Sequence, residues 1–329
     1  MALTKTIKSP PDAEADTPVT DPPVASGRVS PLWVDDMVFT GRTVRIKTTG
    51  AVLRIDAGLL WDVMRWASLY VPVRLKGWVQ ALVMPGPKVA FLPSPPRPWY
   101  LLWSVAVWSG VRFVKDVRHA DAVIRFEDKT WIEAAPGDVI NGQCTDVSKS
   151  QVAKVFERIF GYPLALDPAK HQGPAVEKGE ENGAHDGRIV ECPTPKLDQR
   201  TYQRLIDNIE DGLSTDLRTP FVGFRPVVVY IKQRPRDIRF ANSNSRVRLT
   251  MPQAVFTSDE IEKLAAFARA MKLDWGGMDV LRDGADGRLY VVDVNKTDMG
   301  PPLALPWLDK VRSLQALSRA LKTLLKERS

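Results

Sequence analysis

The sequence predicts a mixed α/β (α+β) fold, and three observations support this. Segments with apolar residues at helical spacing alternate along the chain with short apolar segments typical of strands. A glycine-containing turn at residues 282–287 separates two such strands near the C-terminus. The chain has 329 residues, of which 44% are hydrophobic, so it is long enough for two domains or one composite domain.

Composition and charge exclude several classes of protein. The formal net charge of +7 is a weak indication of anionic partners in a chain of this length. Two cysteines cannot form a disulfide framework, and the three scattered histidines give no zinc motif. The first 30 residues are polar and proline-rich and lack the apolar segment of a secretory signal. We therefore expect a cytoplasmic protein.

The N-terminal part of the chain divides into a tail and a first domain. Residues 1–30 contain few large apolar side chains, so we expect a disordered tail. Residues 31–138 are predicted to form a small α/β domain. Its expected elements are short strands within 43–55, a helix over 59–69, a buried helix within 99–111, and strands at 120–126 and 129–133.

The two apolar helical segments raise the question of a membrane span. Asp62 and Arg65 interrupt the first segment, and the second has only about 13 residues before basic side chains begin. A spanning helix needs about 20 apolar residues. Buried helices are therefore expected, and contact with an anionic membrane surface is the alternative, because Trp and Arg residues are interleaved here.

The rest of the chain, residues 139–322, is predicted to form the second domain. A helix capped by Asp146 or Ser148 ends at Gly161. The other expected helices span 258–271, beginning at Ser258, and 311–325. The expected strands are 162–166, a pair flanking the loop at 178–187, 202–207, a hairpin of 216–221 with 225–232, and a hairpin of 275–281 with 289–295.

The last hairpin carries a cluster of oxygen ligands. Asp293 and Asn295 are two residues apart, so their side chains point to the same face of the sheet. If the turn centres near 285–286, Asp279 lies opposite Asp293 and joins this cluster. Neighbouring carboxylates repel each other unless a cation lies between them, and hard oxygen ligands suit Mg²⁺. A pair of exposed acids in an ordinary hairpin is the simpler alternative, but the flanking glycines Gly276 and Gly277 favour the site.

A second group of residues suits phosphate. Lys178 ends an apolar strand and begins a loop containing Gly179, Gly183 and Gly187. Such a loop can offer backbone N–H groups to phosphate oxygens, and a lysine at the end of a strand adds a compact charge. The loop also contains acidic residues, so an ordinary surface loop is an equal alternative on this segment alone.

The order of these features resembles the ATP-grasp superfamily, and most closely its glutamate-ligase and D-alanine–D-alanine ligase branches. The resemblance covers residues 140–305, about half of the chain. It is most specific in Tyr202-Gln-Arg-Leu-Ile-Asp207, Asp216-Leu-Arg218, Gly276-Gly-Met-Asp279 and Val292-Asp-Val-Asn295. It implies an ATP-grasp fold of two α+β subdomains, preceded by a small α/β pre-ATP-grasp domain.

The resemblance also implies roles for individual residues. Magnesium would be bound by Asp279, Asp293 and Asn295, and the ATP phosphates by Lys149 and Lys178. The hinge that holds adenine would be Gln203, Arg204 and Leu205, with Asp207 at the ribose hydroxyls. Asp216 and Arg218 match the D-x-R pair of the glutamate-ligase branch, and Arg246 and Arg248 would stabilise charge on the transferred phosphoryl group.

Several positions depart from the pattern of the family. The second metal ligand is usually Glu, but Asp293 stands here. An Arg often precedes the first metal ligand, where this chain has Gly277 and Met278. The usual Pro-Gly after the asparagine is replaced by Lys296-Thr-Asp-Met-Gly-Pro-Pro302. These departures concern the substrate and the reaction more than the fold.

The function expected from the resemblance is ATP- and Mg-dependent ligation of a carboxylate to an amine, through an acylphosphate. The substrates would be small molecules or peptides. A kinase acting on a small-molecule or lipid hydroxyl and a non-catalytic nucleotide-binding or membrane-surface protein are the alternatives. Nucleic acid is not an expected partner, because the aromatic residues lie in apolar segments rather than among basic ones.

Overall fold

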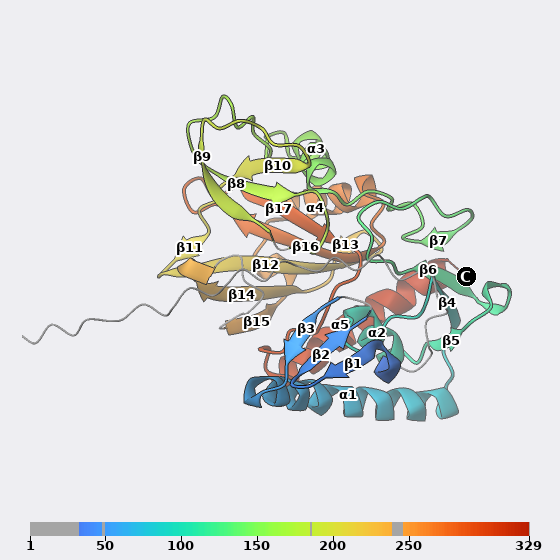
Figure 1. Ribbon diagram of the computed structural model, residues 1–329. Helices are drawn as coiled ribbons and strands as arrows, with labels where there is room; N and C mark the ends of the chain where they lie inside the picture. Colours follow the sequence, from blue (N-terminus) through green and yellow to red (C-terminus); the bar gives the residue numbers. More distant parts are fainter. Residues whose placement is uncertain (1–32, 48–49, 185, 239–245, 329) are drawn as a thin grey trace, which may run out of the picture.

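The computed structural model describes residues 33–47, 50–184, 186–238 and 246–328 (Figure 1). Helices and strands are both present, and within these residues the strands form four sheets, so the predicted mixed α+β fold is confirmed. The tail expected at residues 1–30 lies outside the described residues. Within the described residues, no helix combines the length and the apolar character that a membrane span requires.

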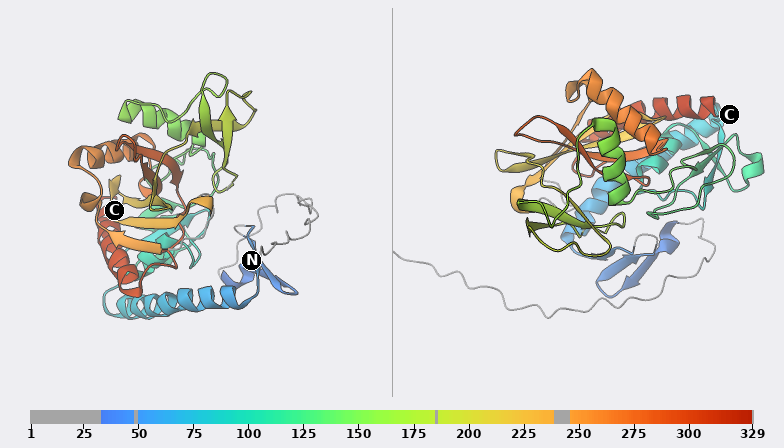
Figure 2. Two further views of the ribbon diagram at one scale, coloured as in Figure 1. Left: turned by 90° about the vertical axis from the view of Figure 1, so that its left-hand side faces the viewer. Right: turned by 90° about the horizontal axis from the view of Figure 1, so that it is seen from above.

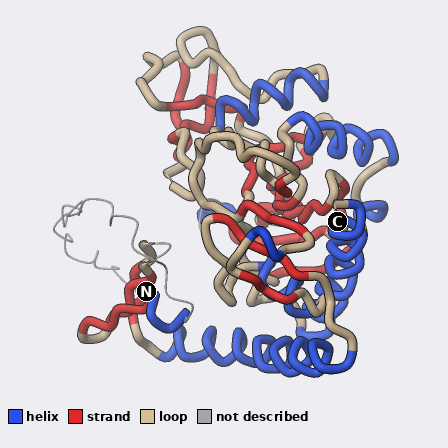
Figure 3. Tube along the Cα trace, turned by 90° about the vertical axis from the view of Figure 1, so that its right-hand side faces the viewer, coloured by secondary structure: helices blue, strands red, loops and turns tan. Residues whose placement is uncertain are grey.

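The chain begins with a short 3₁₀ helix, η1 (Trp33–Asp36), and a three-stranded antiparallel sheet of β1 (Met37–Thr40), β2 (Thr43–Ile46) and β3 (Val52–Arg54). The long helix α1 (Ala57–Val83) follows, and its N-cap Asp56 accepts a hydrogen bond from the backbone of Leu59 at 2.9 Å. Figure 3 shows that β1–β3 lie beyond the N-terminal end of α1, apart from the other strands.

A parallel sheet forms the second part of the N-terminal half. Its strand order is β5-β4-β6-β7, with β4 (Lys88–Leu92), β5 (Arg112–Val114), β6 (Ala122–Arg125) and β7 (Val139–Ile140). Helix α2 (Leu101–Trp108) connects β4 to β5, with η2 (Val117–His119) before β6. The first six residues of α2 are buried, as the apolar sequence predicted.

A small antiparallel sheet, of order β10-β8-β9, comes next. Its strands are β8 (Gly173–Gly179), β9 (Arg188–Cys192) and β10 (Arg200–Arg204). The preceding helix α3 (Lys149–Phe160) has Ser148 as its N-cap and ends at Gly161, whose φ of 83° is the left-handed conformation that glycine tolerates. Both helix ends therefore lie where the sequence predicted them.

The largest sheet is antiparallel and has the central order β15-β14-β12-β16-β17, with β11 (Ile209–Glu210) and β13 (Arg225–Pro226) pairing with β12. Its main strands are β12 (Leu213–Val222), β14 (Val229–Pro235), β15 (Arg246–Thr250), β16 (Trp275–Arg282) and β17 (Leu289–Asn295). Between them lie η3 (Arg236–Ile238), η4 (Pro252–Ala254) and α4 (Ser258–Ala270), and α5 (Trp307–Glu327) closes the chain.

Two apolar cores hold these layers together. One contains α2, α5 and the parallel sheet, together with Val222, Tyr230 and Trp275 from one face of the large sheet. The other packs α3 and α4 against residues of the opposite face, such as Phe221 and Met278. The two halves of the chain therefore share a core through α5, which packs beside α2 (Figures 1 and 2).

Two of the expected strands did not form. The strands expected at 129–133 and 162–166 are not strands, and each segment makes a single bridge, Trp131 to Asp146 and Ala165 to Gln203. Pro163 has no N–H for a ladder, which limits pairing in the second segment. Helix α4 begins at Ser258 as expected, and its N-cap Thr257 forms a capping box with Glu260.

Asn141 joins the segment after β7 to the large sheet. Its backbone N–H donates to Asp274 at 2.8 Å, and its side chain pairs with both backbone groups of Trp275, at 2.6 and 2.9 Å. Asn141 is buried and has a φ of 60°, a conformation in which Asn is better tolerated than most residues. This side chain therefore closes the seam between the N-terminal half and β16.

We expect Asn141→Ala to lower the free energy of unfolding by about 3 kcal/mol, because it leaves two buried backbone groups of Trp275 unpaired. Asn141→Gly loses the same hydrogen bonds but accommodates the positive φ, so it should lose about 1 kcal/mol less. Urea unfolding of both variants measures the two effects. Equal stability of Asn141→Ala and the parent chain would show that the seam is held by other contacts.

Candidate functional site

A row of charged side chains crosses three strands of the large sheet. Arg218 of β12 pairs with Asp279 of β16, and Asp279 pairs with Asp293 of β17. The predicted register of the last hairpin is therefore confirmed. Residues directly opposite in an antiparallel pair share a face, so all three side chains lie on one side of the sheet.

Arg218 forms the centre of this row. Its Nη1 lies 3.0 Å from Oδ2 of Asp279, and its Nη2 pairs with Oδ1 of Asp298. Arg218 and Asp298 are both buried, whereas Asp279 is half-buried, so this guanidinium balances one buried and one partly exposed carboxylate. On the same face, Arg234 pairs with Asp216.

The electrostatics of Asp279 follow from these neighbours. Burial raises the pKa of the carboxyl, but the cations Arg218 and Lys232 outweigh it, with a hydrogen bond from Arg218, and lower the pKa to about 2. Asp279 is therefore an anion at neutral pH. An anionic oxygen beside a second carboxylate is the environment in which a divalent cation can bind.

The two other expected magnesium ligands lie on β17. Asp293 pairs through Oδ1 with Nζ of Lys149, the first residue of α3, and the same oxygen accepts from the backbone of Val294 at 2.9 Å. Oδ1 of Asn295 accepts from the backbone N–H of Thr297 at 2.8 Å. These contacts fix the orientation of both side chains on the face that carries Asp279.

The donor set fits magnesium better than a softer metal. It consists of two carboxylates and an amide oxygen, and Mg²⁺ in proteins is usually held by one or two carboxylates together with phosphate oxygens and water. Across the described residues, no group of three or more His, Cys, Asp and Glu side chains is arranged to hold a metal ion. Two carboxylates and one amide oxygen leave coordination positions of Mg²⁺ open for phosphate oxygens and water.

Lys178 approaches this cluster from the small sheet. Burial is the main cause that lowers the pKa of Lys178, and Lys149 lowers it further, while Asp293, Asp279 and Asp216 act in the opposite direction. Lys178 thus lies within the electrostatic reach of two expected metal ligands on another sheet. The structure brings the expected phosphate-binding lysines, Lys149 and Lys178, to the same place as Asp293.

Gln203 lies on the same face of the small sheet as Lys178. It pairs with Val176 on β8, two residues before Lys178. Gln203 is only 1% exposed, and across the described residues neither Oε1 nor Nε2 of its amide has a hydrogen-bond partner. A buried amide without partners is costly, so a ligand that offers both a donor and an acceptor would satisfy this side chain.

The other residues expected at the hinge come directly after Gln203 in the sequence. Arg204 ends β10, its backbone N–H donates to Leu164 at 2.9 Å, and its guanidinium lies 5.9 Å from the ring centre of Tyr290. Leu205 is half-buried, and Asp207 is exposed and accepts a backbone hydrogen bond from Gly284 at 2.6 Å. These residues therefore form the connection between the small sheet and the large one.

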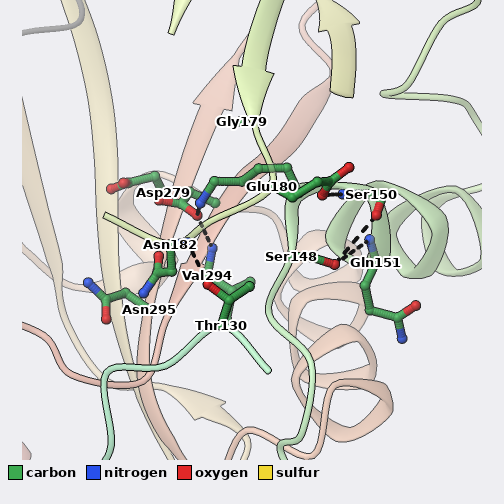
Figure 4. Close-up of polar contacts among 12 residues, drawn as sticks. Thr130, Ser148, Ser150, Gln151, Gly179, Glu180, Asn182, Asp279, Val294 and Asn295 are labelled. Atoms are coloured by element: carbon green, nitrogen blue, oxygen red, sulfur yellow. Dashed lines mark hydrogen bonds and ion pairs between the residues drawn. The ribbon is translucent and has the colours of Figure 1, made fainter. Parts of the chain in front are cut away.

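Backbone and side-chain groups of the glycine loop after β8 form hydrogen bonds with other residues of the chain. The backbone N–H of Gly179 donates to Asp186 at 3.0 Å, and that of Asn182 donates to Thr130 at 2.8 Å. Glu180 accepts from the backbone of Ser150, in the first turn of α3, at 3.0 Å. Figure 4 shows Glu180 above the start of α3, with Asp279 and Asn295 beside the loop. Carboxylate oxygens thus occupy positions that the sequence analysis assigned to phosphate.

Two expected residues do not join the site. Arg246 and Arg248 lie on β15 and are exposed, and Arg248 pairs with Ile231. Ile231 belongs to the face opposite Arg218, so both arginines point away from the row of charges. The residue on the correct face is Lys232, whose pKa is lowered mainly by burial and raised in turn by Asp279. The sequence did contain a signal for this: Ile231 and Lys232 are adjacent in a strand, so the apolar residue faces the core and the lysine faces the site.

Asp298, like Lys232, is a residue of the site that was not predicted from the sequence. Its carboxylate lies over Gly277, and a Cβ atom built on Gly277 would overlap Oδ2 of Asp298. Gly277 and Asp298 are therefore spatial neighbours, and the absence of a side chain at Gly277 leaves room for the carboxylate of Asp298.

The comparisons with known proteins give similarity in structure only. No family model matches the chain. No curated protein matches it significantly. Solved structures similar to it include the ATP-grasp ligase PsnB with a minimal precursor variant, Mg and ADP (13% identity, 73% of this chain and 98% of that chain, TM-score 0.46). A second is a RiPP-associated ATP-grasp ligase from Chryseobacterium gregarium (11% identity, 74% of this chain and 98% of that chain, TM-score 0.47). A third is a RimK-domain ATP-grasp protein from Sphaerobacter thermophilus (12% identity, 73% of this chain and 99% of that chain, TM-score 0.44). These proteins belong to the superfamily that the sequence resembles.

We expect Gly277→Ala to lower the free energy of unfolding by about 3 kcal/mol, because the added methyl group displaces Asp298 and breaks its buried pair with Arg218. The double variant Gly277→Ala with Asp298→Ser should be more stable than Gly277→Ala with Asp298 retained, since the shorter side chain leaves room for the methyl group. Chemical denaturation compares the three chains. A Gly277→Ala variant as stable as the parent would contradict this packing.

Proposed function

We propose that this chain is an ATP-dependent ligase that joins a carboxylate to an amine. The observation that carries the proposal is the ion pair of Lys149 with Asp293, to which Lys178 of the small sheet adds a second cation that interacts electrostatically with Asp293 and Asp279. A cation facing two carboxylates across two sheets suits a triphosphate with its magnesium, since each charged group then meets its opposite. The resemblance in sequence over residues 140–305 supports the same conclusion.

The nucleotide would lie between the two sheets. Lys149 and Lys178 would bind phosphate oxygens, and the ion pair of Lys149 with Asp293 would exchange for a phosphate contact. The unpartnered amide of Gln203 suits the edge of adenine, which offers a donor and an acceptor. Arg204 and Leu205 would contribute backbone groups, and Asp207 would accept from the ribose hydroxyls.

Magnesium would be held by Asp279, Asp293 and Asn295, and it would neutralise charge on the phosphates. In the proposed reaction, an oxygen of the substrate carboxylate attacks the γ-phosphorus and ADP leaves, which gives an acylphosphate. The amine then attacks the acyl carbon, and inorganic phosphate leaves with the former carboxylate oxygen. The chain needs no covalent nucleophile, because positioning and charge stabilisation account for catalysis of this kind.

Lys232 takes the role that the sequence analysis gave to Arg246 and Arg248. It lies beside Arg218 on the face that carries Asp279 and Asp216. A half-buried ammonium in this position can stabilise the negative charge that develops on the transferred group. Arg218 is already bound by Asp279 and Asp298, so we assign it to holding these two acids in place rather than to direct contact with the substrate.

We expect Asp293→Asn to weaken magnesium-dependent ATP binding at least tenfold, because it removes one of two anionic ligands. Lys178→Met should weaken ATP binding with or without magnesium, because its partner is the phosphate. Calorimetric titration with ATP, in magnesium and in EDTA, separates the two effects. Asp309→Asn on the surface of α5 is the matched control. An Asp293→Asn variant with the parent's affinity in magnesium would remove the assignment.

The reaction itself is tested by its products. The parent chain should release ADP and inorganic phosphate when given Mg-ATP with a panel of amino acids and peptides, and Asp293→Ala should abolish this release. A kinase would instead retain the phosphate in a stable phosphorylated product. Recovery of such a product, with no free phosphate, would overturn the ligase proposal while leaving the nucleotide site intact.

A further inference from the structure

Helix α1 presents an apolar face to solvent. Eight large apolar side chains on this helix are between 51% and 69% exposed: Leu60, Trp61, Met64, Val71, Leu75, Trp78, Val79 and Leu82. In Figure 1 and in the left panel of Figure 2, α1 forms one border of the molecule, with the other helices on one side of it. An exposed apolar surface of this size marks an interaction site.

Three polar side chains of α1 form hydrogen bonds within the chain instead. Arg65 donates to the backbone oxygen of Leu303 at 2.7 Å, and Lys76 donates to that of Trp108 at 2.6 Å. Gln80 accepts from Lys76 at 2.8 Å. The helix is therefore inverted relative to an ordinary surface helix, whose polar face meets water and whose apolar face meets the core. Such an arrangement is stable when a partner covers the outer face.

The outer face has the spacing of a helix-pairing seam. Positions 61, 64, 68, 71, 75, 78 and 82 follow one another at alternating steps of three and four residues, and only Ser68 among them is polar. This alternation over three heptads is the pattern with which one helix packs along another. The pattern therefore selects a helix as the occupant.

We propose that the occupant is α1 of a second copy of this chain, packed antiparallel about a two-fold axis near Val71. An isologous interface requires a face that is complementary to itself. Antiparallel pairing about this axis places Trp61 against Leu82, Met64 against Trp78, and Val71 against its own copy. Every large side chain of the seam except Leu75, which lies opposite Ser68, then meets an apolar one.

The sizes of the side chains fit two helices that cross. The smaller residues of the seam, Ser68 and Val71, lie at its centre, and the two tryptophans lie toward its ends. Crossing helices approach most closely at one point and diverge on either side, where larger side chains fill the widening gap. The seam thus has the shape that a symmetric crossing requires.

The available area is sufficient for a stable dimer. Eight large side chains exposed by half to two thirds give on the order of 1,000 Å² of surface per chain. A standard interface takes about 800 Å² from each partner. The outer face of α1 can therefore supply a complete interface without help from other elements.

Charge favours a second copy over an anionic membrane. A helix that lies on a membrane keeps free Lys and Arg side chains near the headgroups. Here Arg65 and Lys76 are bound to backbone oxygens of the same chain, and Arg74 at the border of the face is the remaining basic residue of α1. The apolar face itself carries no basic residue, so it matches another apolar helix.

The proposal is tested with single cysteines. Under mild oxidation, Val71→Cys should give a disulfide-linked dimer, because the two-fold axis brings this position next to its own copy. Cys144 and Cys192 are buried, so the parent chain should remain uncross-linked. Val117→Cys, an exposed position on η2, is the matched control. Absence of linked dimer from Val71→Cys would contradict the antiparallel register.

Solution mass gives an independent test. The parent chain should elute in light-scattering chromatography at about twice 36.7 kDa, and Trp78→Asp should weaken the dimer at least 100-fold with an unchanged circular dichroism spectrum. Val117→Asp should remain dimeric. A monomeric parent chain would overturn the proposal. A monomer that floats with vesicles of phosphatidylserine and phosphatidylcholine, but not as Trp78→Asp, would assign the face to a membrane instead.

Discussion

The ion pairs of Arg218 are the constraint on which the rest of the site depends. Asp279 and Asp298 are held next to each other by this single guanidinium on the central strand β12. Without it, two neighbouring carboxylates would repel each other, and burial would favour protonation of both. With it, the pKa of Asp279 is lowered to about 2 and the carboxylate is available to a cation. The anionic site is therefore built around a fixed internal cation.

The packing of the large sheet explains why these charges lie together. One face of the sheet is covered by α3 and α4 along much of its length. The other face is apolar only at one end, where Val222, Tyr230 and Trp275 meet the core that contains α5. The remainder of that face carries charged residues of β12, β14, β16 and β17. The small sheet adds Lys178, which interacts electrostatically with Asp293, Asp279 and Asp216 on this charged remainder.

The sequence predicted the features that local chemistry determines. The turn at 282–287 fixed the register of the last hairpin, so the pairing of Asp279 with Asp293 could be derived before the structure. Ser148 and Gly161 likewise fixed the ends of α3. The side of a strand that faces the site is determined by non-local pairing. That is why Arg246 and Arg248 were assigned to the site although Lys232 lies on the correct face.

Two further features could not be derived from the sequence, for physical reasons. Asp298 follows β17 in an irregular segment, and its partner Arg218 is 80 residues away, so no periodicity links them. The apolar residues within 59–69 predicted a buried helix, and that expectation was wrong: α1 extends to Val83, and only its residues Leu69 and Val73 are buried. Only the packing of Leu69 and Val73 into the core shows which side remains outside. The roles of the site residues and the division at 138–139 remain proposals.

The outer face of α1 and the charged site are connected by one segment of chain. The residues after β17 include Asp298, which pairs with Arg218 and whose backbone oxygen accepts from Leu101 at 2.8 Å. Five residues later, the backbone oxygen of Leu303 accepts from Arg65 on α1, and the indole N–H of Trp307 donates to the backbone oxygen of Ser68 at 3.3 Å. These contacts tie α1 and the ion pair of Asp298 with Arg218 to the same segment of chain, so the position of α1 and the position of Asp298 are set by neighbouring hydrogen bonds.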